Sequence, residues 1–206
     1  MFVWKLKQVS VDNLDTRDFI LQKVAPIFNK QGYVGTSLSD LTKATGLTKG
    51  AIYFYFENKQ ELAVEAFKLN VKKMTSPLGI QISLYTNSIE KLRVLTNYYR
   101  NYYNMITDNG GCPILNVGAD SNNINPALFD AVKKVSKRLE KDLITIIENG
   151  VINNEIRSNI DAGVYGKNIY AMIEGSIFMA STRHDGSYIN NMMDMIDQLI
   201  QEKFIS

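Results

Sequence analysis

Four consecutive aromatic residues, Tyr53-Phe54-Tyr55-Phe56, follow the turn-forming stretch Thr-Gly-Leu-Thr-Lys-Gly of residues 45–50. A helix of a globular protein buries one face, and successive side chains on it point in different directions. Four rings in a row therefore cannot all lie in the core. We expect Phe56 to pack inside, and Tyr53 and Tyr55 to face outward.

The residues around this turn predict two short helices, from about Leu38 to Thr45 and from Thr48 to Phe56. Gly46 stands where the chain needs a positive φ to enter the second helix. Ile52 and Phe56 are four residues apart, so they share a face that can pack back onto the first helix. This spacing is typical of a DNA-binding helix-turn-helix.

The whole chain favours an all-α fold of about nine helices, because it has only four prolines and few alternating, strand-like runs. We expect the first helix to begin at an N-cap, Thr16, and to stop at Gly32. Asn125-Pro126 and Asp161 are expected to begin two long helices, since Asn and Asp are strong N-caps and Pro suits the first helical position.

The composition is that of an ordinary soluble protein. The 206 residues include one cysteine, Cys112, so no disulfide can form within the chain, and the formal net charge is +2. The first 60 residues hold eight of the 23 Lys and Arg but only five of the 21 Asp and Glu, which permits a local basic surface. No run is long and apolar enough for a membrane span or a signal peptide, and we expect a cytoplasmic protein.

No motif of an enzyme is present. The sequence has no P-loop, no dinucleotide-binding glycine pattern and no nucleophile elbow. Glu174 and Asp185 are single carboxylates that we interpret as solvent-exposed or helix-end groups. Neither His184 nor Cys112 has a partner at metal-ligand spacing, so we expect no metal and no cofactor.

Residues 32–62, GYVGTSLSDLTKATGLTKGAIYFYFENKQEL, resemble the amino-terminal domain of TetR-type transcriptional regulators. The preceding TRDFILQKVAPIFNKQGY, residues 16–33, and two later segments, GCPILN (111–116) and EGSIFMASTRHD (174–185), are also similar to that family. The resemblance implies an all-α homodimer whose first three helices bind palindromic DNA. It also implies a carboxy-terminal helical domain that binds a small ligand and dimerises through its last two long helices.

On this basis we divide the chain into an N-terminal extension (1–15), a helix-turn-helix DNA-binding domain (16–60) and a helical ligand-binding and dimerisation domain (61–206). The free N–H groups at the start of the second short helix favour a phosphate there. Thr36 and Ser37 are expected to cap the first short helix and, as a second role, to contact phosphate. The full set of expected DNA contacts is Thr36, Ser37, Thr48, Lys49, Gly50, Tyr53, Tyr55 and Lys59.

A tyrosine-rich helix is predicted from about Ser88 to Ile106, and its rings and hydroxyls suit an aromatic or amphipathic ligand. Simple packing and surface exposure would explain the same tyrosines. The expected ligand pocket comprises Tyr99, Tyr102, Tyr103, Phe129, Met172 and Met179.

The last two helices combine apolar stripes with small residues, which would let them form a four-helix interface between two subunits. Burial of the same stripes within one chain is the open alternative. The expected dimer interface comprises Met172, Gly175, Ser176, Met179, Met192, Met193, Ile196, Leu199 and Ile200.

These features predict a transcriptional repressor that binds palindromic operator DNA as a homodimer and responds to an unidentified small-molecule effector. Two alternatives remain open at this stage. One is a helix-turn-helix dimer without a small-molecule switch, and the other is a helical protein-interaction dimer.

Overall fold

The computed structural model describes the backbone of residues 2–205 and the side chains of residues 16–205. This part of the chain is all-helical, as expected, with ten α-helices where about nine were predicted. The helices are α1 (Phe2–Gly35), α2 (Leu38–Thr45), α3 (Lys49–Tyr55), α4 (Lys59–Ser83), α5 (Ser88–Arg100), α6 (Tyr102–Asp108), α7 (Pro113–Ser121), α8 (Pro126–Ile152), α9 (Ala162–Arg183) and α10 (Ser187–Leu199), followed by the π-helix η1 (Ile200–Phe204).

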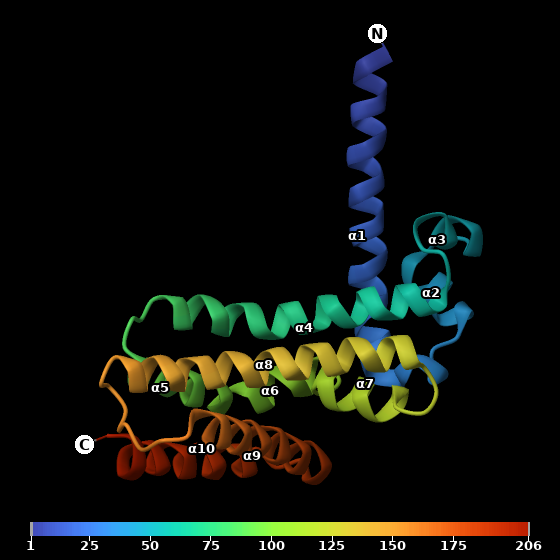
Figure 1. Ribbon diagram of the computed structural model, residues 1–206. Helices are drawn as coiled ribbons and strands as arrows, with labels where there is room; N and C mark the ends of the chain where they lie inside the picture. The colour runs from blue at the N-terminus through green and yellow to red at the C-terminus, as the bar shows by residue number, and fades with distance from the viewer. Residues whose placement is uncertain (1, 206) are drawn as a thin grey trace.

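The helices form two structural regions that share α4 (Figure 1). The short helices α2 and α3 lie beside α1 at one end of α4. The long helices α4 and α8 pack on each other, and α9 and α10 form a further layer against α8 and α5. Within the described residues, no helix is long and apolar enough to cross a membrane.

Side-chain caps begin the helices where the sequence predicted them. The Asn125 side chain accepts a hydrogen bond from the Leu128 N–H at 3.1 Å, and Asp161 accepts one from the Val164 N–H at 3.0 Å. Gly46 ends α2 with a φ of 71°, as expected. These caps depend only on neighbours in the sequence, which is why a local pattern predicts them.

Two predicted boundaries were wrong. Thr16 lies inside α1, because the helical backbone already begins at Phe2, so Thr16 is not an N-cap. The single helix predicted over residues 88–106 is two helices, which meet at Asn101.

The break in α1 at Gly32 is held by side chains from two other helices. Gly32 has φ 73° and ψ 176°, which no regular helix contains. The Tyr33 N–H donates to the Asp120 carboxylate of α7 at 2.6 Å, and the Lys59 ammonium of α4 donates to the Tyr33 carbonyl at 2.6 Å. The Thr36 hydroxyl donates to the Gly32 carbonyl at 2.6 Å. The chain that enters α2 is thus fixed to the helical body through α7 and α4.

We expect Gly32→Ala to lower the free energy of unfolding by about 1–3 kcal/mol, the usual cost of a strained backbone residue. Its φ lies in the left-handed region, and an added Cβ would lie 2.7 Å from an Asp120 carboxylate oxygen. Urea unfolding followed by circular dichroism measures the change.

The matched control is Gly79→Ala in α4, where an added Cβ meets nothing within 4 Å. There the better helix propensity of alanine should leave stability equal or raise it by up to about 1 kcal/mol. Equal effects of the two substitutions would contradict a special role for Gly32.

Candidate nucleic-acid interface and ligand cavity

The amino end of α3 is open to solvent. Thr48 caps the helix, with its hydroxyl oxygen accepting from the Ala51 N–H at 3.2 Å. Thr48, Lys49 and Gly50 are all exposed, and an added Cβ on Gly50 would meet only the Thr48 hydroxyl, at 4.0 Å. Nothing in the described chain covers this end of α3, so a flat polar surface such as a DNA groove wall can approach it.

Ser37 and Thr36 differ sharply in accessibility. Ser37 is exposed and forms a capping box with Asp40, whose carboxylate accepts from the Ser37 N–H at 2.8 Å and hydroxyl at 2.6 Å. These hydrogen bonds lower the pKa of Asp40. Thr36 is fully buried and its hydroxyl is bonded to the Gly32 carbonyl, so this structure leaves it no surface for the expected phosphate contact.

The four aromatic residues are arranged differently from the expectation. Phe56 is 1% exposed, as expected, but Phe54 is the outward ring, at 75% exposed. Tyr53 and Tyr55 are only partly exposed and pack against the core, and burial raises the pKa of Tyr53. Ile52 and Phe56 both face inward, so Phe54, midway between them, must face outward. The same spacing was present in the sequence and would have identified Phe54.

Lys59 was expected to reach the DNA backbone, but its ammonium is occupied in the joint at Gly32. It donates to the Tyr33 carbonyl and lies 4.5 Å from the centre of the Tyr33 ring. Burial lowers the pKa of Lys59, while Asp120 and Asp40 act in the opposite direction. Lys49 is therefore the exposed cation on α3, and Lys59 serves the connection between the two regions.

The apolar stripe expected at the dimer interface lies mostly inside the chain. Ser176 of α9, Met193 and Ile196 of α10 and Ile200 of η1 are each at most 4% exposed, because α10 packs against α9 and α5. These four side chains therefore leave little surface for a partner subunit. Met172, Met179, Met192 and Leu199 are partly buried at the edge of the same contact, and Gly175 is exposed.

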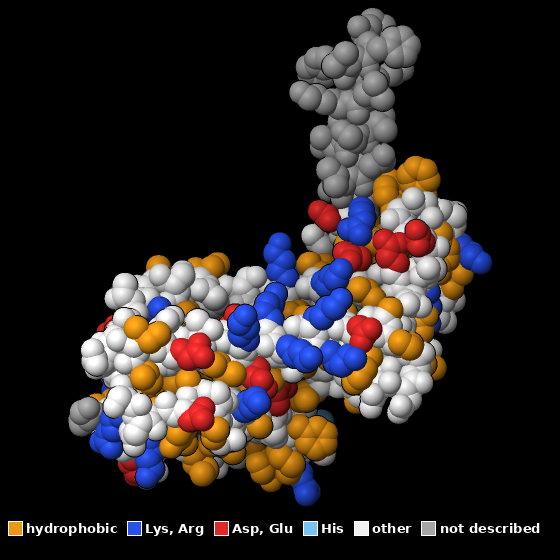
Figure 2. Space-filling model, viewed as in Figure 1, with side chains coloured by type: hydrophobic (Ala, Val, Ile, Leu, Met, Phe, Trp, Pro, Cys, Tyr) orange, Lys and Arg blue, Asp and Glu red, His pale blue; other side chains and the backbone are white. Residues whose placement is uncertain are grey.

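A different apolar face of α9 and α10 is exposed, as the hydrophobic side chains along the lower edge of Figure 2 indicate. Val164 and Phe178 on α9 are 52% and 57% exposed, and Met195 on α10 is 58% exposed. Gly175, where an added Cβ would meet nothing within 4 Å, lies on α9 between Val164 and Phe178 in sequence. Such a face can cover a second helical pair closely.

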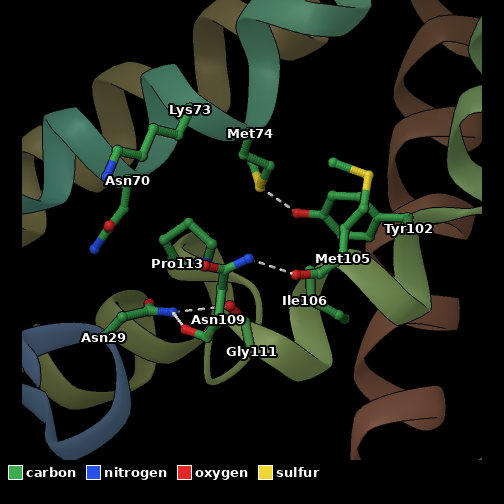
Figure 3. A pocket seen from close by; sticks show the side chains of 10 residues that line it. All are labelled: Asn29, Asn70, Lys73, Met74, Tyr102, Met105, Ile106, Asn109, Gly111 and Pro113. Carbon is green, nitrogen blue, oxygen red and sulfur yellow. Dashed lines mark hydrogen bonds between the residues drawn. The ribbon is translucent and has the colours of Figure 1, made fainter. Parts of the chain in front are cut away.

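A cavity of about 80 Å³ lies where α1, α4, α6 and α7 meet (Figure 3). The Asn29 amide donates to the Asn109 and Gly111 carbonyls at 2.8 and 2.9 Å. On the opposite side, the Tyr102 hydroxyl points to the Met74 sulfur. This small cavity belongs to the joint between the two regions and has room for little more than water.

A larger cavity, about 250 Å³, lies among α4, α5, α8 and α9. Its lining is mainly aliphatic, with two tyrosines and, on α8, the exposed Arg138 and Asp142. The lining residues are Thr75, Leu78, Gly79, Ile82, Leu95, Tyr99, Arg138, Leu139, Asp142, Leu143, Ile146, Tyr170 and Ile173. An apolar cavity with a few polar groups is the usual form of a small-molecule site.

The residues expected to form one ligand pocket are not brought together. Tyr99 lines the larger cavity, Tyr102 the smaller one, and Tyr103 a separate hollow beside His184. The other three, Phe129, Met172 and Met179, line none of these cavities. The sequence analysis missed Tyr170 and the α4 and α8 residues, because helical spacing does not tell which helices enclose a space.

Glu174 was interpreted as a solvent or helix-end group, and this was wrong. Its Oε2 atom is buried and burial raises the carboxyl pKa to about 7, although a hydrogen bond with Tyr170 acts in the opposite direction. The neighbouring Cys112 is also buried, with its thiol pKa raised to about 12. That thiol is therefore protonated at neutral pH and a poor nucleophile.

Comparison with known proteins gives matches to both regions. Residues 20–66 match the model for bacterial regulatory proteins of the tetR family, and residues 88–196 match that for the tetracyclin repressor-like C-terminal domain. A TetR-family regulator from Cytophaga hutchinsonii is 32% identical, with a TM-score of 0.86 over 95% of this chain and 98% of that one. A TetR regulator from Chloroflexus aurantiacus is 28% identical, with a TM-score of 0.87 over 94% and 98%.

The chain belongs to the TetR family of transcriptional regulators. Among known sequences, it is 24% identical to the HTH-type transcriptional regulator LmrA of Bacillus subtilis over 91% of this chain and 97% of LmrA. It is 26% identical to the uncharacterised regulator YxaF of the same organism over 92% and 97%. The matched proteins are transcriptional regulators that bind DNA, not enzymes.

We expect Lys49→Ala to weaken binding to duplex DNA of any sequence and to make the slope of log affinity against log salt shallower by about 1. The reason is that an exposed lysine at the amino end of the recognition helix would neutralise one phosphate. Fluorescence anisotropy at several NaCl concentrations measures the slope. Lys141→Ala, an exposed lysine on α8, is the matched control and should leave the slope unchanged.

In the same assay, Phe54→Ala tests whether α3 contacts bases, independently of the neutralisation of phosphate charge. A ring on the outward face of α3 can contact thymine methyl groups, which carries sequence information but no counterion release. The variant should keep the salt slope and lose preference for thymine at one position of each half-site. An unchanged slope in Lys49→Ala, or an unchanged preference in Phe54→Ala, would remove the respective residue from the interface.

Proposed function

We propose that this protein is a repressor that binds an inverted-repeat operator as a homodimer and releases it when a small molecule occupies the larger cavity. The single observation that carries the proposal is the position of α4. Its first turn, with Lys59, holds the chain that leads into α2. Its far end contributes Thr75, Leu78, Gly79 and Ile82 to the cavity. One continuous helix thus connects the proposed ligand site with the helix-turn-helix formed by α2 and α3.

The joint at Gly32 supplies the second link. Asp120 of α7 binds the Tyr33 N–H, and Asn116 of the same helix donates to the Asn29 carbonyl of α1 at 3.0 Å. Asn70 of α4 donates to the Ala25 carbonyl of α1 at 2.8 Å. A shift of α4 relative to α7 would therefore turn α1 and, with it, α2 and α3.

The response follows from differential binding to two arrangements of the dimer. A ligand shifts the equilibrium only if it binds one arrangement better than the other. We propose that the cavity is better formed when the two recognition helices are wrongly spaced for successive major grooves. Occupation then lowers the affinity for the operator without any contact between ligand and DNA.

The exposed apolar face of α9 and α10 supports dimerisation. Two copies of this face, related by a twofold axis, would bury Val164, Phe178 and Met195 from each subunit. The proposed interface thus replaces the buried residues of the original expectation with their outward neighbours on the same helices.

Selection of bound duplexes from a random DNA pool tests the function. We expect an enriched inverted repeat whose half-sites are about one helical turn or slightly more apart. Enrichment of a single half-site would contradict dimeric reading, and no enrichment by folded protein would contradict operator binding. The selected duplex then serves as the probe for release by small molecules.

Phe178→Glu should convert the dimer to monomers in size-exclusion chromatography with light scattering, because a charge would be buried in the proposed interface. The monomer should keep its helical circular dichroism, since Phe178 is 57% exposed.

Ile196→Glu is the informative counterpart on α10. Ile196 is 1% exposed, so this change should reduce stability by several kcal/mol whatever the oligomeric state. A dimer that persists in Phe178→Glu would place the interface elsewhere.

A further inference from the structure

Glu174 of α9 is a partly buried residue whose carboxylate has one fully buried oxygen and no cation beside it among the described side chains. Its Oε2 atom has no hydrogen-bond partner among the described residues. None of the ion pairs between described side chains includes it. A buried charge usually has a partner, because removing it from water is costly. The site is therefore incomplete by the ordinary rules of protein interiors.

The Glu174 carboxylate lies behind the wall of the larger cavity, near the lining residues Tyr99 and Tyr170. Tyr170 precedes Glu174 by four residues on α9, so the two side chains share a face. Tyr170 lines the cavity, its hydroxyl donates to the Ser136 hydroxyl at 3.1 Å, and after the larger effect of burial the nearby Glu174 also raises its pKa. A ligand against Tyr170 would thus lie within electrostatic reach of Glu174.

Aromatic rings surround the same region. Tyr99 lines the cavity, and its ring centre lies 5.2 Å from that of Tyr102. Both tyrosines are near enough to Glu174 for its charge to raise their pKa, beyond the larger effect of burial. The faces of aromatic rings carry partial negative charge and attract cations.

Among the side chains of residues 16–205, no cation pairs with Glu174. Tyr99, Tyr102, Tyr170 and Cys112 face it, and all have raised pKa values, so they are neutral near pH 7. Arg138 and Asp142, both exposed on α8, carry opposite charges at the cavity and largely cancel each other. The field in the interior is therefore negative.

We infer that the effector of the larger cavity is an organic cation, an amine or quaternary ammonium with an apolar body, and that Glu174 is its counter-charge. The cationic group lies against Tyr99 and Tyr170, and the apolar part lies among the aliphatic side chains of α4, α5 and α8. This inference rests on the proposed function, because it assigns the ligand class of the same cavity.

A proton must leave when the cation binds. With a pKa of about 7, Glu174 is partly protonated at neutral pH in the empty protein. A nearby positive charge favours the carboxylate and lowers its pKa, so binding releases a proton. Cation affinity should therefore rise as the pH increases through about 7.

Binding of a matched pair of probes tests the ligand class. Phenyltrimethylammonium and its uncharged counterpart, tert-butylbenzene, have nearly the same shape, and 4-tert-butylbenzoate supplies a negative charge. Titration calorimetry in buffers of different ionisation enthalpy measures affinity and proton release together. We expect the ammonium to bind at least about tenfold more tightly than the other two, the scale of one desolvated contact between a cation and an aromatic ring. Equal or tighter binding of the uncharged or anionic probe would overturn the inference.

Glu174→Gln tests the residue. It preserves shape, and it should raise the melting temperature or leave it unchanged, because an unpaired buried charge is removed. It should also weaken the binding of phenyltrimethylammonium by about tenfold or more and abolish the release of a proton on binding. The affinity for tert-butylbenzene should stay unchanged. Glu148→Gln, an exposed carboxylate on the same helix as Arg138 but outside the cavity, is the control. Equal weakening by both variants would show a general charge effect and overturn the role of Glu174.

Release of the selected operator duplex is a separate readout. If the ammonium binds through Glu174 but DNA stays bound, the cavity takes cations as inferred, and the proposal that its ligand releases DNA is contradicted. If uncharged molecules release DNA and ammonium compounds do not bind, the response stands and the cationic class fails.

Discussion

The hydrogen bond from the Tyr33 N–H to Asp120 is the contact on which the arrangement of the two regions depends. A break in a helix leaves backbone groups without partners, and these must be satisfied elsewhere. Here the free N–H after Gly32 binds a carboxylate of α7, and the nearby carbonyl binds the Lys59 ammonium of α4. The direction in which the chain leaves α1 is thereby set by the helical body. The helix-turn-helix, α2 and α3, is thereby tied to both α7 and α4.

This joint also explains why a cation expected at the DNA serves a different purpose. Lys59 gains a carbonyl, an aromatic face and the field of Asp120, and each is lost if its ammonium swings outward. In the proposed interface, phosphate contact is then left to Lys49, which is exposed at the amino end of α3. Lys59 thus fixes the first turn of α4, and Lys49 is left to attract DNA at the amino end of α3.

The sequence predicted features that depend on neighbours along the chain. Caps such as Asn125 and Asp161 bond to backbone groups three residues away, so a short pattern specifies them. Helical periodicity likewise grouped Ile196 with other apolar residues of α10. It could not tell whether that stripe meets α9 of the same chain or a second subunit, because both surroundings are equally apolar. Phe178 became evident as an outward residue only when the packing of the neighbouring helices was known.

Glu174 is a residue whose surroundings the sequence could not predict. A single carboxylate on a helix looks the same in the sequence whether water or a cavity faces it. Replacing it by an apolar residue of similar size would remove a desolvation cost, and so favour the empty protein. A carboxylate at this place would instead stabilise the liganded state, because a bound cation offsets the desolvation cost of the carboxylate. If the inferred cation binds there, the desolvation cost of the carboxylate would become selectivity of the cavity against anions and against uncharged molecules of the same shape.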